Sequence, residues 1–334
     1  MNILITGVAG LLGSHLARSF IENGHHVIGV DSLIGGYIDN VPGECEFYSF
    51  DLMDMERIDE VFSKPVDLVV HAACTAHEGL SVFSPAFISK NTFQITLNIM
   101  SMAIRHNVKK FVYMSSMARY GKQETPFTED MIPRPQDPYG ISKVAAEESI
   151  RNLCQTHGLD FVIMVPHNII GPGQKYDDPY RNVAAIMINR MLQGKQPIIY
   201  GDGEQSRCFS FISDVVSPLM RACLTDSANS KVVNIGPDED SVTINQLAIK
   251  IAHQLSFDLK PIYVPERPQE VKIATCSSNL SRKLLGYETK VSLDQGLAEL
   301  ISYIRTRGTL PFSYSFELEI KSQLTPTTWT NKLI

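Results

Sequence analysis

The N-terminal residues constrain the fold most, because the apolar segment Asn2–Thr6 leads directly into a turn with three glycines. The glycines are spaced three residues apart, and a segment of helical period follows them. A turn between a strand and a helix directs backbone N–H groups and the positive end of the helix toward one site, which suits a pyrophosphate. The spacing differs from GxGxxG, but its place after a first strand favours nucleotide binding. We predict a dinucleotide site at Gly7, Gly10, Leu11, Leu12 and Gly13.

Further apolar segments, rich in Val, Ile and Phe, alternate with helical segments through the first half of the chain. Their short length and the turn residues at their ends are typical of buried parallel strands. We predict strands at Asn2–Thr6, His26–Asp31, Glu46–Phe50, Val66–Ala72, Lys110–Ser115 and Phe161–Val165. We predict helices at Leu11–Asn23, Met55–Ser63, Pro85–His106 and Pro138–His157. This order predicts an α/β protein with a Rossmann-type, doubly wound parallel sheet.

The alternation loosens after residue 165, where proline and glycine become frequent. Here we predict helices at Arg181–Leu192, Thr243–Leu255 and Leu293–Arg305 and strands at Pro197–Tyr200, Arg207–Ile212 and Val232–Ile235. We expect a dinucleotide-binding domain over residues 1–165, with a strand near 232–236 that returns to its sheet. A smaller α/β substrate-binding domain is expected over residues 166–308.

Residues 309–334 have a different pattern and form a C-terminal extension, which we call the tail. Phe312–Ile320 alternates apolar and polar residues, which predicts an edge strand. Trp329 is the only tryptophan of the chain. We therefore expect the tail to pack on the body of the protein or on a partner subunit.

Composition excludes several classes of protein. The 30 Lys and Arg against 36 Asp and Glu give a net charge of −6, which argues against a nucleic-acid-binding surface. The longest apolar stretches are too short to cross a bilayer, and no basic leader precedes the first strand. The six cysteines have no metal-binding spacing and suggest reduced thiols. We expect a soluble cytoplasmic protein with no metal, no nucleic-acid partner and no membrane association.

Asp31 ends the second predicted strand, some 20 residues after the glycine turn. A carboxylate at this place accepts hydrogen bonds from both ribose hydroxyls and repels a 2′-phosphate. The residues that follow, Ser32, Leu33 and Ile34, offer no arginine to a 2′-phosphate. The sequence therefore favours NAD over NADP.

Tyr139 and Lys143 are four residues apart at the start of a predicted helix, so both lie on one helix face. Ser116 follows the predicted strand Lys110–Ser115 within the same sheet. An ammonium beside a phenol favours the phenolate, and the positive nicotinamide of NAD⁺ acts in the same direction. We predict that Tyr139 is a base, that Ser116 relays the proton from a substrate hydroxyl, and that Lys143 also binds the nicotinamide ribose.

Taken in order, these motifs resemble those of the extended short-chain dehydrogenase/reductase family, and most of all its nucleotide-sugar epimerases that act on UDP-glucose or UDP-N-acetylglucosamine. The resemblance covers about residues 1–307. It rests on Gly7–Gly13, Asp31, Asp51-Leu52, His71-Ala72-Ala73, Ser115-Ser116, Tyr139–Lys143, Pro166-His167-Asn168 and Tyr200-Gly201-Asp202-Gly203.

The resemblance implies further contacts to the two ligands. The additional cofactor-binding residues would be Asp51 and Leu52 beside the adenine, Ala72 and Ala73 in the cofactor cleft, and Asn91, Ser115 and Pro166. The substrate would be a nucleotide sugar, linked to UDP. Its contacts would be Ser116, Asn168 at the diphosphate, Tyr200 against the base or ribose, Arg207 and Arg267 at the diphosphate oxygens, and Glu270 at the nucleotide ribose.

Departures from the family pattern narrow the reaction. Ser116 is followed by Met117-Ala118 in place of the Asp-Glu pair of the family's dehydratases, and Ala118 stands where its 3,5-epimerases have a cysteine. Ala274 stands where 4-epimerases of unmodified hexoses tend to carry an aromatic residue, which leaves room for a 2-acetamido group. Other departures, such as Cys74-Thr75, leave the sugar open.

We therefore expect epimerisation at C4 of a nucleotide-linked hexose through a transient 4-keto sugar, with NAD regenerated in each cycle. The alternatives are reduction of a nucleotide-linked 4-keto sugar, 2-epimerisation of a nucleotide-linked deoxysugar and, more distantly, a non-catalytic dinucleotide sensor. A homodimer is expected through Pro85–His106 and Pro138–His157, because related proteins pair two helices of each subunit.

Overall fold

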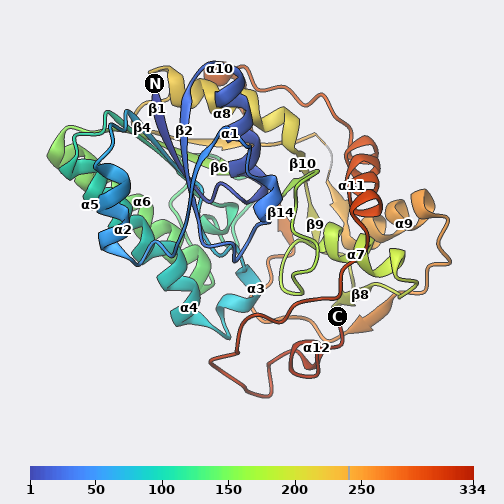
Figure 1. Ribbon diagram of the computed structural model, residues 1–334. Coiled ribbons are helices and arrows are strands. Elements are labelled where there is room, and N and C mark those ends of the chain that lie inside the picture. Colours follow the sequence, from blue (N-terminus) through green and yellow to red (C-terminus); the bar gives the residue numbers. More distant parts are fainter. Residues whose placement is uncertain (240) are drawn as a thin grey trace.

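Seven parallel strands form the central sheet, in the order β11-β6-β5-β4-β1-β2-β3. The computed structural model describes residues 1–239 and 241–334 (Figure 1). The strands are β1 Asn2–Thr6, β2 His26–Asp31, β3 Glu46–Ser49, β4 Leu68–His71, β5 Lys110–Met114, β6 Asp160–Pro166 and β11 Lys231–Ile235. The predicted Rossmann-type α/β sheet is confirmed.

Helices cover both faces of the sheet because its strands are apolar on both sides. In β1, Ile3 and Ile5 pack into one core and Leu4 into the other. The first core includes α1 (Leu11–Glu22) and α8 (Ile212–Leu224). The second includes α2 (Met55–Phe62), α5 (Ile95–Arg105) and α6 (Pro138–His157), which lie together on the left in Figure 1.

β1 pairs with β2 on one side and with β4 on the other. Successive strands are therefore added on one side of β1 up to β3 and on its other side from β4 onward, so the direction reverses at β1. In open α/β sheets, ligands bind outside the carboxyl ends of the strands at such a reversal. The glycine turn follows β1 at this edge, and the loop after β4 begins beside it at Ala72. The fold therefore places a ligand cleft where the sequence motifs cluster.

The helix predicted at Pro85–His106 has three parts. These are α4 (Pro85–Ser89), a π-helical segment over Lys90–Gln94, and α5. A short helix, α3 (Glu78–Ser81), precedes α4 at the carboxyl edge of the sheet. No helix within residues 1–239 or 241–334 has both the length and the apolar character needed to cross a membrane.

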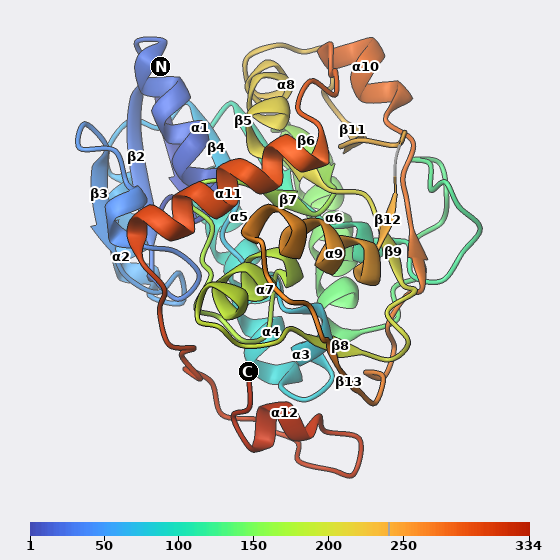
Figure 2. The same cartoon turned by 90° about the vertical axis from the view of Figure 1, so that its right-hand side faces the viewer.

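The second half of the chain adds small sheets and helices beside the carboxyl edge (Figure 2). The strand pairs are β7 (Ile169–Ile170) with β10 (Ser210–Phe211) and β8 (Ile198–Tyr200) with β13 (Ile262–Val264); β9 (Ser206–Arg207) lies between β12 (Val242–Thr243) and β14 (Ile273–Ala274). The helices are α7 (Val183–Leu192), α9 (Ile244–Leu255), α10 (Asn279–Leu285) and α11 (Leu293–Arg307). The single strand predicted at Arg207–Ile212 is wrong, because β9 and β10 pair with different partners and α8 begins at Ile212.

The predicted edge strand in the tail is also wrong, since Phe312–Ile320 pairs with no strand among the described residues. Its alternation arises because every second side chain, Tyr314, Phe316 and Leu318, packs on the body. Trp329, in the short helix α12 (Thr327–Thr330), is only 2% exposed. The tail therefore packs on its own chain, below α3 and α4 in Figure 1.

Candidate active site

One cavity of about 500 Å³ lies at the carboxyl edge of the sheet and extends into the smaller region. It is lined by every residue for which the sequence predicted a role: Gly7, Gly10, Leu11, Leu12, Gly13, Asp31, Asp51, Leu52, Ala72, Ala73, Asn91, Ser115, Ser116, Tyr139, Lys143, Pro166, Asn168, Tyr200, Arg207, Arg267 and Glu270. The individual roles of these residues stay predictions. Their shared location shows that one ligand-sized space connects the glycine turn with the arginines.

The glycine turn has room for backbone only. Gly7 has a φ of +76°, and a Cβ there would lie 2.8 Å from the backbone nitrogen of Ala73. A Cβ at Gly13 would lie 2.1 Å from the carbonyl oxygen of Gly7. Side chains are therefore excluded from the contact between turn and helix, and the backbone can approach a pyrophosphate closely. The turn fits the diphosphate of a dinucleotide.

Asp31 lies at the end of β2 beside the turn. Its Oδ2 accepts a hydrogen bond from the Ala9 backbone N–H at 2.9 Å, and its Oδ1 accepts one from the Leu33 N–H at 2.7 Å. Burial raises the pKa of the carboxyl, while these hydrogen bonds lower it. Both oxygens keep acceptor capacity toward the cavity, as the predicted contact with ribose hydroxyls requires.

Tyr139 and Lys143 lie in the first turns of α6, which Asp137 caps by accepting from the Gly140 N–H at 2.9 Å. Lys143 is 1% exposed, and its Nζ donates to the Met114 carbonyl at 2.6 Å and lies 5.8 Å from the centre of the Tyr139 ring. Burial raises the pKa of Tyr139 well above its usual range, and a hydrogen bond with Ser116 lowers it. The protein by itself thus favours the neutral phenol.

A buried ion pair between Arg119 and Glu147 lies beside Tyr139 and Ser116. Glu147, one helical turn beyond Lys143 in α6, accepts two bonds from Arg119 Nε, at 3.0 and 3.1 Å, and one from the Ser115 hydroxyl. The pair attaches α6 to the loop after β5, so Tyr139 and Ser116 are held in one arrangement. No sequence pattern indicates this ion pair, because the two charges are 28 residues apart and each resembles an ordinary surface residue.

At the other end of the cavity, Arg267 forms a two-point ion pair with Glu270, at 2.9 and 3.2 Å. Its guanidinium lies 4.6 Å from the centre of the Tyr200 ring. Arg207 donates to the backbone carbonyls of Ser206, Val271 and Lys272. Both arginines are therefore held by the protein and line the cavity.

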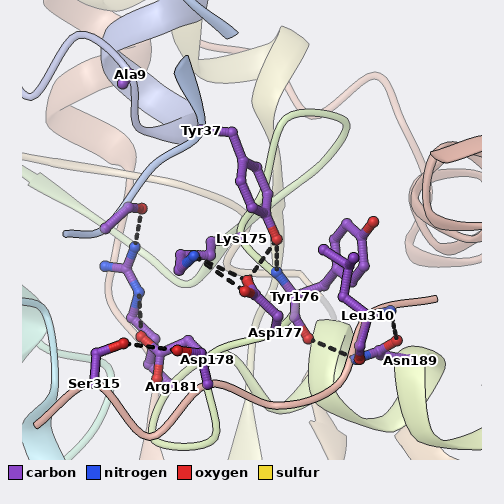
Figure 3. Close-up of polar contacts among 12 residues, drawn as sticks. Ala9, Tyr37, Lys175, Tyr176, Asp177, Asp178, Arg181, Asn189, Leu310 and Ser315 are labelled. Carbon is purple, nitrogen blue, oxygen red and sulfur yellow. Dashed lines mark hydrogen bonds and ion pairs between the residues drawn. The ribbon is translucent and has the colours of Figure 1, made fainter. Parts of the chain in front are cut away.

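Several cavity residues were not predicted, among them His77, Glu78, Arg181 and Ile334. His77 Nε2 lies 2.7 Å from the Asp178 carboxylate, and both side chains are at least 97% buried. Arg181 donates to the Gly35 carbonyl at 2.8 Å and lies near Asp178 (Figure 3). His77 and Glu78 lie two and three residues after the Cys74-Thr75 departure, and that position after β4 is the signal that could have found them.

The segment that carries Asp178 connects the glycine-turn region with the tail (Figure 3). The Tyr37 hydroxyl donates to Asp177 at 2.6 Å, and the Asn189 side chain donates to the Leu310 carbonyl at 2.9 Å. Farther along the tail, Thr328 Oγ1 lies 2.6 Å from the Tyr200 hydroxyl. The tail therefore forms part of the wall around the arginine end of the cavity.

The chain was compared with known proteins. A model of the NAD dependent epimerase/dehydratase family matches residues 3–236. The chain belongs to this family. The predicted NAD cofactor is thereby confirmed, and the chain is an NAD-dependent enzyme of the epimerase type. The described residues contain no group of three or more His, Cys, Asp or Glu placed to bind a metal.

Three relatives show how varied the family's substrates are. A UDP-glucose 4-epimerase of Thermotoga maritima, solved with UDP-glucose, is 34% identical, with a TM-score of 0.87 over 92% of this chain and 99% of that one. A UDP-glucuronic acid 4-epimerase of Bacillus cereus, solved with UDP-glucuronic acid and NAD, is 25% identical, with a TM-score of 0.86 over 92% and 100%. A GDP-mannose 3,5-epimerase of Arabidopsis thaliana is 30% identical over 89% of this chain and 80% of its own length.

Proposed function

We propose that the protein epimerises a UDP-linked hexose at C4, either glucose/galactose or their 2-acetamido forms. The supporting observation is that Tyr139 and Ser116 lie in the same cavity as the glycine turn and the two arginines. A substrate whose diphosphate binds at the arginines can thus present its sugar to Tyr139.

The cofactor end would consist of the glycine turn, Asp31 and Lys143. The turn would bind the diphosphate of NAD and Asp31 its adenosine ribose, while Lys143 would bind the nicotinamide ribose. When bound, NAD⁺ supplies a hydride acceptor that takes the C4 hydrogen and later returns it.

Tyr139 would take the proton of the C4 hydroxyl as C4 loses its hydride, and a C4 carbonyl results. The proton returns from Tyr139 to the same oxygen when C4 regains its hydride on the opposite face. Because burial favours the neutral phenol, Tyr139 needs nearby positive charge to act as a base. Lys143 is the cation that the protein supplies beside it.

Inversion requires that the sugar turn while the nucleotide stays bound. Arg207, Arg267 and Asn168 would bind the diphosphate, since all three line one end of the cavity. Ala274 also lines the cavity, and its small side chain leaves space for a 2-acetamido group.

Incubation of the protein with UDP-glucose, UDP-N-acetylglucosamine and their GDP, CDP and dTDP counterparts tests this proposal. We expect the anomeric ¹H NMR signals of the 4-epimer to grow with a UDP-sugar only. A net change of absorbance at 340 nm with a keto sugar would indicate a reductase instead. No turnover of any nucleotide sugar would favour a dinucleotide sensor. The homodimer and the cytoplasmic location stay predictions.

A further inference from the structure

Glu78 is a charged cavity residue to which the proposed reaction assigns no part. It is the first residue of α3 and belongs to the loop region after β4. The Ser81 hydroxyl fixes this turn by donating to the Glu78 carbonyl at 2.7 Å, and Ser81 and Leu80 are fully buried. The backbone of Glu78 is thus anchored, while its side chain lines the cavity and is accessible from within it.

The carboxylate lies between the two functional ends of the site. It interacts electrostatically with Tyr139 on one side and with Arg207 and Arg267 on the other. A Cβ at the next residue, Gly79, would lie 3.3 Å from Arg267 Nη1, so α3 starts directly against this arginine. Because Glu78 lines the same cavity, a hexose with its diphosphate at the arginines and its C4 at Tyr139 would lie within reach of this carboxylate.

Neither arginine uses Glu78 as its partner. Arg267 is paired with Glu270, and Arg207 donates to three backbone carbonyls. Within the described part of the chain, the Glu78 carboxylate interacts with its neighbours through longer-range electrostatics, and the only hydrogen bond that Glu78 accepts is the one from Ser81 to its backbone carbonyl. Its oxygens are therefore available to accept hydrogen bonds from sugar hydroxyl or amide groups.

We propose that the Glu78 carboxylate contacts the hexose and makes the site select uncharged hexoses over hexuronates, an inference that rests on the proposed epimerase function. A hexuronate carries a carboxylate on the sugar ring, which an ionised Glu78 repels. In a partly desolvated site, such repulsion between like charges costs at least about tenfold in affinity. The selection would separate this chain from its relative that was solved with UDP-glucuronic acid.

The charge of Glu78 depends on pH near neutrality. Burial and the nearby Asp137 raise the pKa of Glu78 to about 7, and Arg207 and Arg267 oppose this rise. Glu270 also faces it and acts in the same direction as Asp137. A larger fraction of Glu78 is thus ionised at pH 8 than at pH 6, while a hexuronate is ionised at both.

Calorimetric titration of the NAD-loaded protein tests this proposal with UDP, UDP-glucose and UDP-glucuronate. At pH 8 we expect UDP-glucose to bind at least about tenfold more tightly than UDP-glucuronate. In Glu78→Gln this ratio should approach one, and retained binding of UDP shows that the variant is folded. The matched control Glu60→Gln, at an exposed position of α2 outside the cavity, should keep the ratio of the wild type.

The wild-type protein gives a second test without any substitution, because the ratio should fall at pH 6. Equal binding of the two sugars by the wild type at pH 8 would overturn the proposal, as would full discrimination in Glu78→Gln. Failure of the proposed function would look different, since the wild type would then bind neither UDP-sugar more tightly than UDP or would epimerise neither.

Discussion

The two ends of the cavity are built in different ways. The end proposed to bind NAD, called the nucleotide end below, consists mainly of backbone. It has a glycine turn that excludes any Cβ, followed by Asp31, whose carboxylate is oriented by two N–H groups. The arginine end, which is proposed to bind the nucleotide sugar and is called the sugar end below, consists of charged side chains from distant segments, such as Glu78, Arg207 and Arg267. A binding site made of backbone suits a cofactor that is the same in all members of a family. A site made of side chains can change its ligand through single substitutions. This difference explains how one family keeps NAD while its members act on different sugars.

The largest expected effect on activity comes from substitution of Tyr139, which lies where the two ends of the cavity meet. Tyr139→Phe removes the proton acceptor and should lower kcat by about 10³-fold, with NAD and UDP affinities unchanged. Tyr263→Phe, at an exposed residue of β13, is the matched control and should keep full activity. Epimerisation of UDP-sugars measured by NMR distinguishes the two variants. Near-normal turnover by Tyr139→Phe would remove this residue from the mechanism.

At the sugar end, Asp178→Asn breaks the buried pair with His77 and should destabilise the protein by about 3 kcal/mol. His77 lowers the pKa of Asp178, against the effect of burial. The ionised Asp178 carboxylate therefore stabilises the protein above the ordinary carboxyl pKa of about 4, and this contribution is lost as the pH falls through the lowered value. Urea unfolding between pH 3 and pH 7 should show a loss of folding stability at acid pH in the wild type and a smaller loss in the variant.

The control for this prediction is Asp258→Asn, since Asp258 pairs with Lys260 at the surface. Surface pairs contribute about 0–1 kcal/mol, so this variant should match the wild type closely. Equal stability of both variants would show that the His77–Asp178 pair does not hold the sugar end together.

At the nucleotide end, Gly13→Ala should weaken NAD binding by about 100-fold, because the new Cβ would collide with the Gly7 carbonyl and displace the turn. Gly43→Ala is the control, since a Cβ there meets no atom within 4 Å. Titration with NAD measures both. Binding of NAD to Gly13→Ala with wild-type affinity would contradict the backbone cradle, and loss of UDP binding as well would show that the two ends are not independent.

The smallest effect concerns stability at the sugar end. Because the pKa of Glu78 is raised, ionisation of Glu78 disfavours the folded state, and this cost appears as the pH rises from about 4.5 to about 7. Glu78→Gln should therefore raise the melting temperature at pH 8 and leave it unchanged at pH 4. We expect no more than about 1 kcal/mol, because solvent in the cavity screens the charge. A lower melting temperature at pH 8 would mean that Glu78 stabilises the fold.

The sequence predicted the central sheet and the NAD cofactor correctly because both predictions depend on local patterns. The glycine turn and Asp31 lie within the first 31 residues, and each strand of the sheet is a short apolar segment that is recognisable by itself. The pair Arg119–Glu147 and the pair His77–Asp178 were not predicted, since their partners lie 28 and 101 residues apart and only tertiary packing joins them.

The tail shows why a correct pattern can lead to a wrong element. Alternation in Phe312–Ile320 does reflect one buried face, but that face packs on aromatic side chains such as Phe87. A strand needs a neighbour with free N–H and C=O groups, which the sequence alone does not locate. Periodicity therefore predicted the burial of the tail but not its hydrogen bonding.

The central claim is that hydrogen leaves C4 as a hydride, remains in the site and returns to C4. Incubation of the protein with UDP-glucose in D₂O tests it directly, with ¹H NMR of the C4 position of substrate and product. The account predicts that UDP-galactose forms with the original hydrogen at C4 and no deuterium at any ring carbon. Deuterium at a ring carbon of the product would contradict it, because it would show that a carbon-bound proton had exchanged with solvent.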